Sequence, residues 1–215
     1  MVKLSRISAL FIIFVFSKTS GITAAITQPD VRKTIPMAEY NLREAMTQLW
    51  SDHGIWTRIY IIEALNNAPG KEAAADRLMK NQDDIGNAIA QFYGEDAGKK
   101  MTALLKNHIK IAVDIVDAAK ANNQQKLKAN DNLWHSNADD IALFLRNANP
   151  GNWKFKPLQT MLYDHLKLTT NEVLARLKKD WSGDVTNFDK VMEQLRGMGQ
   201  ELSNGIVKQF PAKFK

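Results

Sequence analysis

Apolar residues recur along this chain at alternating spacings of three and four, which is the period of an amphipathic helix. From Asn41 onward the pattern is interrupted only by short stretches rich in Gly, Pro and Asn, where helices tend to end. Alternation typical of β-strands is almost absent, so we expect an all-α fold. The predicted helices cover about residues 41–65, 72–93, 96–121, 124–147, 157–181 and 184–209.

The lengths of these helices and of the links between them predict how they pack. Each helix has about 20 to 26 residues and is therefore roughly 30 to 39 Å long. Short links place consecutive helices side by side and antiparallel. Because no shift of composition divides the chain, we expect a single-domain antiparallel bundle of about six helices over residues 41–210. An exposed lead-in over residues 26–40 precedes it, and a basic tail over residues 211–215 follows.

The first 25 residues have the layout of a secretory signal peptide. Lys3 and Arg6 form a basic start, residues 7–16 form an apolar stretch, and residues 17–25 are mostly small or polar. The apolar stretch has about half of the roughly 20 residues that a transmembrane helix needs. We therefore expect cleavage near Ala25, export to a periplasm or out of the cell, and no stable membrane anchor after processing.

Charge and cysteine content narrow the classes of partner and chemistry. Lys3, Arg6 and Lys18 are the only charged residues among the first 25, so cleavage lowers the formal net charge from +6 to +3. The other lysines are spread over many helical faces with carboxylates between them, so we expect no nucleic-acid partner, while a protein partner stays open. The sequence has no cysteine, which excludes disulfides, thiolate metal sites and cysteine nucleophiles.

Several apolar stripes contain a polar residue near the middle of their helix. In chain order these residues are His53, Asn81, His108, Asn137 and His165. The midpoints of antiparallel helices of similar length lie at one level, so we expect these side chains to converge inside the bundle. Burying polar groups without partners costs about 1 to 3 kcal/mol each, so such a layer needs internal hydrogen bonds or a ligand.

Imidazoles from separate helices suit Zn(II), Cu(II), Ni(II) and Fe(II) as ligands. We therefore predict that His53, His108 and His165 form an internal site for a transition metal or a small ligand. The alternative is a structural or partner-binding bundle without catalysis, in which the polar layer only fixes the register of the helices.

Four more residues belong to this hypothesis. Glu172 lies two helical turns after the histidine of its own helix and on the same face, so it is a candidate carboxylate ligand. Asp189 is the second candidate carboxylate, although its place near a helix start also fits an exposed residue. Asn81 and Asn137 are predicted to orient the rings by hydrogen bonds. His135 lies one position off its stripe, and we interpret it as a surface residue.

No complete catalytic motif accompanies these residues. The sequence lacks His-Glu-x-x-His, Gly-x-Ser-x-Gly and the phosphate-binding Gly-x4-Gly-Lys-Ser/Thr. No glutamate stands three positions before any histidine, as it does in ferritin-like di-iron bundles. An enzyme is therefore less favoured than a binding protein, and a metal-assisted hydrolase remains a third hypothesis.

The segment over residues 49–58 has the pattern Leu-Trp-x2-His-x2-Trp-x-Arg and resembles a family of small bacterial all-helical proteins. The similarity continues through Asn81 to Asn87, His108, Trp134 to Ile141, His165 with Glu172, and Gln209-Phe210-Pro211. Some members carry the labels glycosyltransferase or acetylglutamate kinase, but such enzymes need sheet-based nucleotide sites, which a helical pattern does not provide. The resemblance implies the helical fold and the positions of the three histidines, without an established activity.

Overall fold

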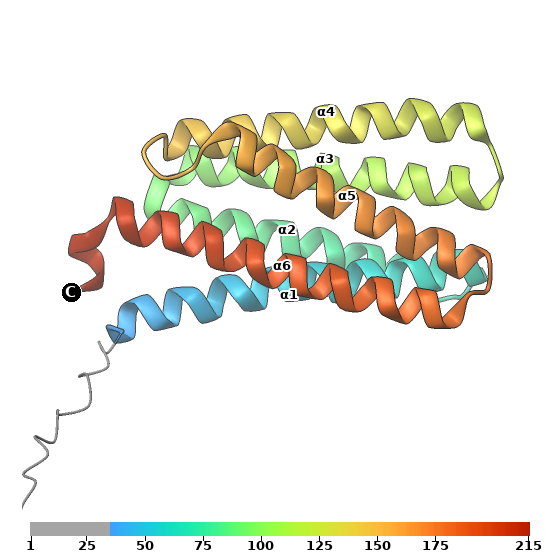
Figure 1. Ribbon diagram of the computed structural model, residues 1–215, viewed down its shortest axis with the longest axis horizontal. Coiled ribbons are helices and arrows are strands. Elements are labelled where there is room, and N and C mark those ends of the chain that lie inside the picture. The colour runs from blue at the N-terminus through green and yellow to red at the C-terminus, as the bar shows by residue number, and fades with distance from the viewer. Residues whose placement is uncertain (1–34) are drawn as a thin grey trace, which may run out of the picture. The chain divides into compact units, whose positions relative to one another are not determined.

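In a computed structural model, which describes residues 35–215, the chain folds into six long helices (Figure 1). They are α1 (Met37–Asn66), α2 (Lys71–Tyr93), α3 (Glu95–Lys120), α4 (Gln124–Ala148), α5 (Phe155–Leu177) and α6 (Trp181–Gln209), followed by a 3-10 helix, η1 (Pro211–Phe214). Residues 35–215 contain no strand, so the all-α prediction is confirmed. The predicted signal peptide lies outside the described residues.

The six helices form a closed ring. Each helix packs against the next one along the chain, and α6 returns to pack against α1. Consecutive helices run antiparallel, so α1, α3 and α5 share one direction, and α5 crosses obliquely from α4 to α6 (Figure 1). Across the interior, α3 also contacts both α1 and α5. The three helices that carry the stripe histidines are therefore neighbours inside the bundle.

The turn between α5 and α6 differs from the prediction, because α5 ends four residues before Trp181, which instead begins α6. Lys179 adopts a left-handed conformation with φ 59°, and the N–H of Asp180 donates to Ala175 O at 2.9 Å. This bond closes the end of α5. The carboxylate of Asp180 then accepts from the N–H of Gly183 at 2.9 Å and caps α6.

Both ends of the bundle extend beyond the predicted limits. α1 begins at Met37 instead of Asn41, directly after a proline, which tolerates a helix start because its nitrogen has no hydrogen to satisfy. The predicted basic tail, residues 211–215, contains η1, and Phe214 is buried there. Its ring stacks on that of Phe92 from α2, with 5.9 Å between the centroids. These residues therefore cover one end of the core.

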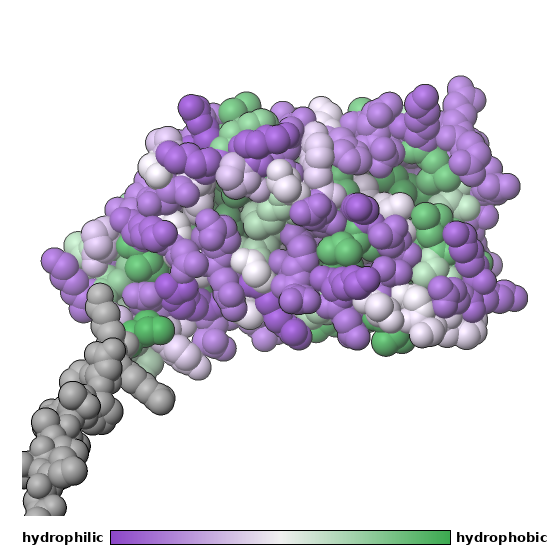
Figure 2. Space-filling view, viewed as in Figure 1, coloured by the Kyte–Doolittle hydropathy of each residue, from purple (hydrophilic) through white to green (hydrophobic). Residues whose placement is uncertain are grey.

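Two glycines let α1 and α6 approach closely. A Cβ atom at Gly199 would lie 2.9 Å from the backbone oxygen of Met46, and one at Gly54 would lie 2.7 Å from Leu195 Cδ1. The glycine in the middle of α1 is therefore explained by helix packing. On the outside, the face in Figure 2 is dominated by hydrophilic residues. Within the part of the chain that the structure describes, no helix has the length and apolar character needed to cross a membrane.

Candidate functional site

The three stripe histidines meet inside the bundle. His53 on α1, His108 on α3 and His165 on α5 are 2%, 3% and 4% exposed. The ring centroids of His53 and His165 lie 5.6 Å apart, and those of His108 and His165 lie 6.2 Å apart. These three rings, called the histidine layer below, bring together residues that are far apart in the sequence.

Burial keeps the histidine layer neutral. Desolvation lowers the pKa of His53 to about 4 and that of His108 to about 3, and the neighbouring His53 ring lowers the latter further. Desolvation, together with the other two rings, also places the pKa of His165 well below its ordinary value. At neutral pH each ring therefore has one N–H and one nitrogen with a free lone pair.

Asn137 on α4 determines which nitrogen of His108 holds the proton. Its amide nitrogen donates to Leu104 O, one turn before His108, at 3.1 Å. The other amide atom is therefore the oxygen, and it lies 2.8 Å from His108 Nδ1. An amide oxygen can only accept, so Nδ1 has the hydrogen and Nε2 has the lone pair.

A similar arrangement surrounds His53. The amide nitrogen of Asn81 on α2 donates to Leu49 O, again one turn before the histidine, at 3.0 Å. The next residue, Gln82, donates to the amide oxygen of Asn81 at 3.1 Å. Both amides lie beside His53 and partly offset the lowering of its pKa. Among residues 35–215, neither His53 Nδ1 nor Gln82 Oε1 has a hydrogen-bond partner, although both are buried.

Gln194 on α6 is placed relative to His165 as Asn81 is relative to His53. The pattern of apolar stripes did not predict this residue. Its amide nitrogen donates to Met161 O, one turn before His165, at 2.9 Å, and it partly offsets the lowering of the histidine pKa. Gln194 Oε1 and His165 Nδ1 are both buried without a partner in the described part of the chain. Gln194 is only half-buried, so it does not interrupt an apolar stripe. Gln194 follows His165 at nearly the same interval as Asn81 follows His53 and Asn137 follows His108, and this spacing could have predicted its role.

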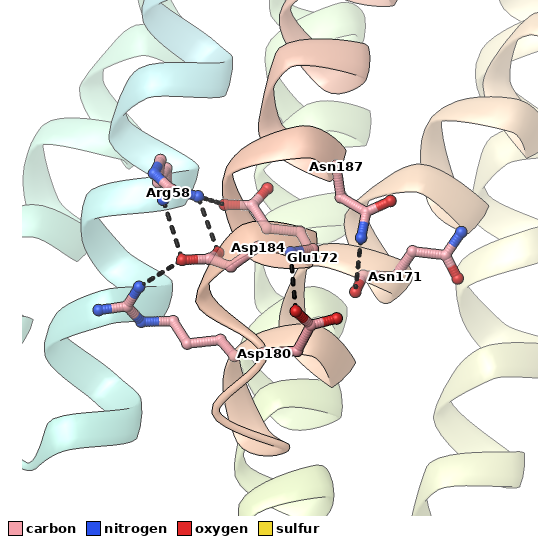
Figure 3. Close-up of polar contacts among 8 residues, drawn as sticks. Arg58, Asn171, Glu172, Asp180, Asp184 and Asn187 are labelled. Carbon is pink, nitrogen blue, oxygen red and sulfur yellow. Dashed lines mark hydrogen bonds and ion pairs between the residues drawn. The ribbon is translucent and has the colours of Figure 1, made fainter.

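The two predicted carboxylate ligands lie elsewhere. Glu172 is buried and accepts a hydrogen bond from Arg58 at 2.7 Å (Figure 3). Burial raises the pKa of Glu172 to about 7, although Arg58 acts in the opposite direction. Asp189 lies on the exposed face of α6. Within residues 35–215, no group of three or more His, Cys, Asp or Glu side chains is arranged to hold a metal ion.

Arg58, Glu172, Arg176 and Asp184 form a second polar group, called the ion-pair cluster below, in which the two carboxylates are buried and the two guanidinium groups are partly exposed. Asp184 accepts from two nitrogens of Arg58, both at 3.0 Å, and from Arg176 at 2.7 Å. Figure 3 shows the carboxylate of Asp184 between these groups. When Glu172 is ionised, two cations and two anions balance each other and the cluster has no net charge. Three of these residues were not predicted, although Glu172 and Arg176 have the spacing of neighbours on one helical face.

A small cavity lies one helical turn from the histidine layer. Thr57 and Thr169, each four residues after a layer histidine, help to line it, together with Tyr60 and Trp134. Its volume is about 30 Å³ and its wall is apolar. Such a space has room for one or two water molecules, so an organic ligand does not fit there.

Comparison with protein-family models, with curated proteins and with solved structures finds no match to this chain. The resemblance to a family of bacterial helical proteins therefore stays a prediction, and the inferences about function rest on the residues and their geometry.

Proposed function

We propose that this chain is an exported metal-binding protein in which His53, His108 and His165 bind one transition-metal ion. The observation that carries the proposal is the contact of three neutral imidazoles from three helices, with ring centroids 5.6 and 6.2 Å apart, in a layer shielded from solvent. Neutral imidazole nitrogens suit Zn(II), Cu(II), Ni(II) and Fe(II). Protons compete with metals for such nitrogens, and the lowered pKa values reduce that competition.

Binding would require the rings to turn, because the described residues hold no ready-made metal group. Each ligating nitrogen must come within about 2.1 Å of the ion. Moving a side chain away from its preferred torsion costs about 1 kcal/mol per residue. Zinc-finger peptides, which also use thiolate ligands, bind zinc with about 10 to 16 kcal/mol, so even a fraction of that free energy would offset three such rotations. Glu172 and Asp189 are not part of this proposed ligand set.

Two observations bear on the alternatives. The cavity beside the layer, with about 30 Å³, is too small for an organic ligand, and no layer histidine lines it. The complete hydrogen bond between His108 and Asn137, at 2.8 Å, favours a second candidate, a structural layer that fixes helix register without a ligand. The two candidates differ in metal content, which can be measured directly.

The test is elemental analysis of the untagged protein, purified without chelator and then equilibrated with Zn(II), Cu(II), Ni(II) or Fe(II). We expect near-stoichiometric binding of at least one metal by the unmodified protein and loss of binding in His108→Ala. His135→Ala is the matched control, because this ring lies outside the layer, 4.6 Å from the ring of Tyr163. Circular dichroism checks that each variant folds, and His108→Asn replaces His108→Ala if the smaller side chain prevents folding.

Two outcomes would reject the metal site. One is an unmodified protein that binds none of the four metals, which would leave the structural layer as the function of these residues. The other is equal binding by the His108 and His135 variants, which would place the metal outside the histidine layer.

A further inference from the structure

The three layer histidines recur at nearly equal intervals. His108 follows His53 by 55 residues, and His165 follows His108 by 57 residues. Each lies on an odd-numbered helix, and the next helix along the chain packs antiparallel against it. The bundle can therefore be divided into three consecutive hairpins, α1–α2, α3–α4 and α5–α6, with one layer histidine in each.

Each hairpin also carries one amide at an equivalent place. Asn81, Asn137 and Gln194 follow their histidines by 28, 29 and 29 residues. Each amide nitrogen donates to the backbone oxygen of the residue four positions before the histidine. The pairs are Asn81 with Leu49, Asn137 with Leu104 and Gln194 with Met161, at 3.0, 3.1 and 2.9 Å. One tertiary hydrogen bond is thus made three times, at the same position relative to the histidine.

The local sequences repeat as well. Residues 49–53, 104–108 and 161–165 are Leu-Trp-Ser-Asp-His, Leu-Leu-Lys-Asn-His and Met-Leu-Tyr-Asp-His. Residues 81–86 and 137–142 are Asn-Gln-Asp-Asp-Ile-Gly and Asn-Ala-Asp-Asp-Ile-Ala, while residues 194–199 are Gln-Leu-Arg-Gly-Met-Gly. The third copy keeps the amide, the apolar fifth position and the small sixth position. Shared spacing, shared sequence and shared hydrogen bonding are three separate signs of one repeated unit.

We infer that the bundle is a threefold repeat of one helical hairpin, and that Gln194 is the third positioning amide, equivalent to Asn81 and Asn137. In each hairpin an amide oxygen holds the histidine as the tautomer with the hydrogen on Nδ1, so Nε2 is the unprotonated nitrogen in all three rings. That oxygen belongs to Asn137 for His108, to Gln194 for His165 and, for His53, to Gln82 next to Asn81. The inference rests on the proposed function, because it names the nitrogen through which each ring binds the metal. Three such nitrogens can only accept, so the layer suits a cation.

The atoms around His165 support this role for Gln194. Because the amide nitrogen of Gln194 donates to a backbone oxygen, its oxygen is the atom left to accept. That oxygen and His165 Nδ1 both lack a partner within residues 35–215 and both are buried. Leaving the two atoms unpaired costs about 1 to 3 kcal/mol each, and a hydrogen bond from Nδ1–H to the amide oxygen removes both costs. In the first hairpin the Asn81 oxygen already accepts from Gln82, so the corresponding couple among residues 35–215 is the unpaired Gln82 Oε1 and His53 Nδ1.

The experiment is nitrogen-15 NMR of the metal-free protein with labelled histidine, which distinguishes a protonated from an unprotonated ring nitrogen. We expect all three layer histidines to show a protonated Nδ1 and an unprotonated Nε2. Gln194→Met removes the amide at similar volume, so the His165 resonances should lose this pattern while those of His53 and His108 keep it. Gln194→Asn retains an amide and should restore the pattern. Gln200→Met, on the exposed face of the same helix, is the control and should change nothing.

The inference fails if His165 in the unmodified protein has its proton on Nε2, a result that does not depend on the folding of any variant. It also fails if Gln194→Met leaves the His165 resonances unchanged. Because the spectra are recorded without metal, this test is independent of the metal measurement. A protein that binds no metal but shows three Nδ1–H rings would reject the proposed function and still support the repeat and the role of Gln194.

Discussion

The histidine layer and the ion-pair cluster are both polar groups between packed helices, but they are stabilised in different ways. In the cluster, Arg58 donates to Glu172 and Asp184, Arg176 donates to Asp184, and the opposite charges attract. In the layer the rings avoid charge altogether, and two of the three Nδ1 atoms lack a partner among the residues described. The cluster joins helices through opposite charges, whereas the layer offers the lone pairs of neutral rings, which suit a cation.

The largest expected difference between the two regions is the loss of folding stability at low pH, which the histidine layer causes. Below pH 6.5 the unfolded chain takes up protons on its histidines, whereas folded His53 and His108 remain neutral until about pH 4 and 3. The unfolded state then binds more protons, so stability falls as pH drops through this window. The loss is about 1.4 kcal/mol per pH unit for each such histidine. Urea unfolding at a series of pH values between neutrality and about pH 4 measures it.

Glu172 changes the stability of the fold with pH in the opposite direction. Its pKa rises from 4.5 to about 7 on folding, so between these values the folded state binds the extra proton and stability falls as pH rises. The effect of three histidines is larger than that of one carboxyl group, so stability still falls as pH drops. Glu172→Gln removes the opposing effect and should make this fall in stability steeper. A stability that is constant between about pH 6.5 and 4.5 would show that the layer is not neutral in the folded protein.

The next largest effect should come from Asp184→Asn. The substitution leaves Arg58 and Arg176 with Glu172 as the one anion of the cluster. Removing one partner of a fully buried ion pair costs about 3 to 5 kcal/mol, and because these arginines are partly exposed we expect the lower end of that range, about 3 kcal/mol. The midpoint of urea unfolding should fall accordingly. Asp189→Asn, which lies exposed on the same helix, should change stability by less than about 0.5 kcal/mol. Equal effects of the two substitutions would mean that the cluster contributes no more than a surface ion pair.

A smaller effect is expected from Asn137→Leu. The change removes the hydrogen bonds to His108 Nδ1 and Leu104 O, both made inside the bundle, and should cost about 2 kcal/mol. Chemical denaturation of this variant can be compared with that of Asn147→Leu, an exposed position on the same helix. If Asn137→Leu is as damaging as Asp184→Asn, then the energetic distinction between the neutral layer and the charged cluster is incorrect.

The fold followed from the sequence because helical periodicity and Gly, Pro or Asn at the links are local signals. The break between α5 and α6 was not predicted, because its turn is made by Lys178, Lys179 and Asp180, of which only Asp180 has a strong preference for turns. Nothing in the apolar spacing shows that Lys179 adopts a left-handed conformation.

The candidate site was predictable only where a polar residue interrupts an apolar stripe. His53, His108 and His165 do so, and similar helix lengths then place them at one level. Arg58 and Asp184 are separated by 126 residues, and their pairing depends on the closure of α6 onto α1, which no local pattern shows. Gln194 could have been found only by comparing the three hairpins with one another.

The closed ring of helices also determines how much chain entropy is lost when each helix–helix contact forms. Around the ring, every contact between adjacent helices except that of α6 with α1 joins neighbours in the sequence through a short turn, so the chain loses little freedom in bringing them together. The seam between α1 and α6 joins the two most distant helices, and its cost grows only with the logarithm of the loop length. The pairing of Arg58 with Asp184 and the close packing of the two helices offset that cost, so native-state hydrogen exchange should show α1 and α6 protected as well as the other helices. Gly199, set against the backbone of Met46, lies at that seam.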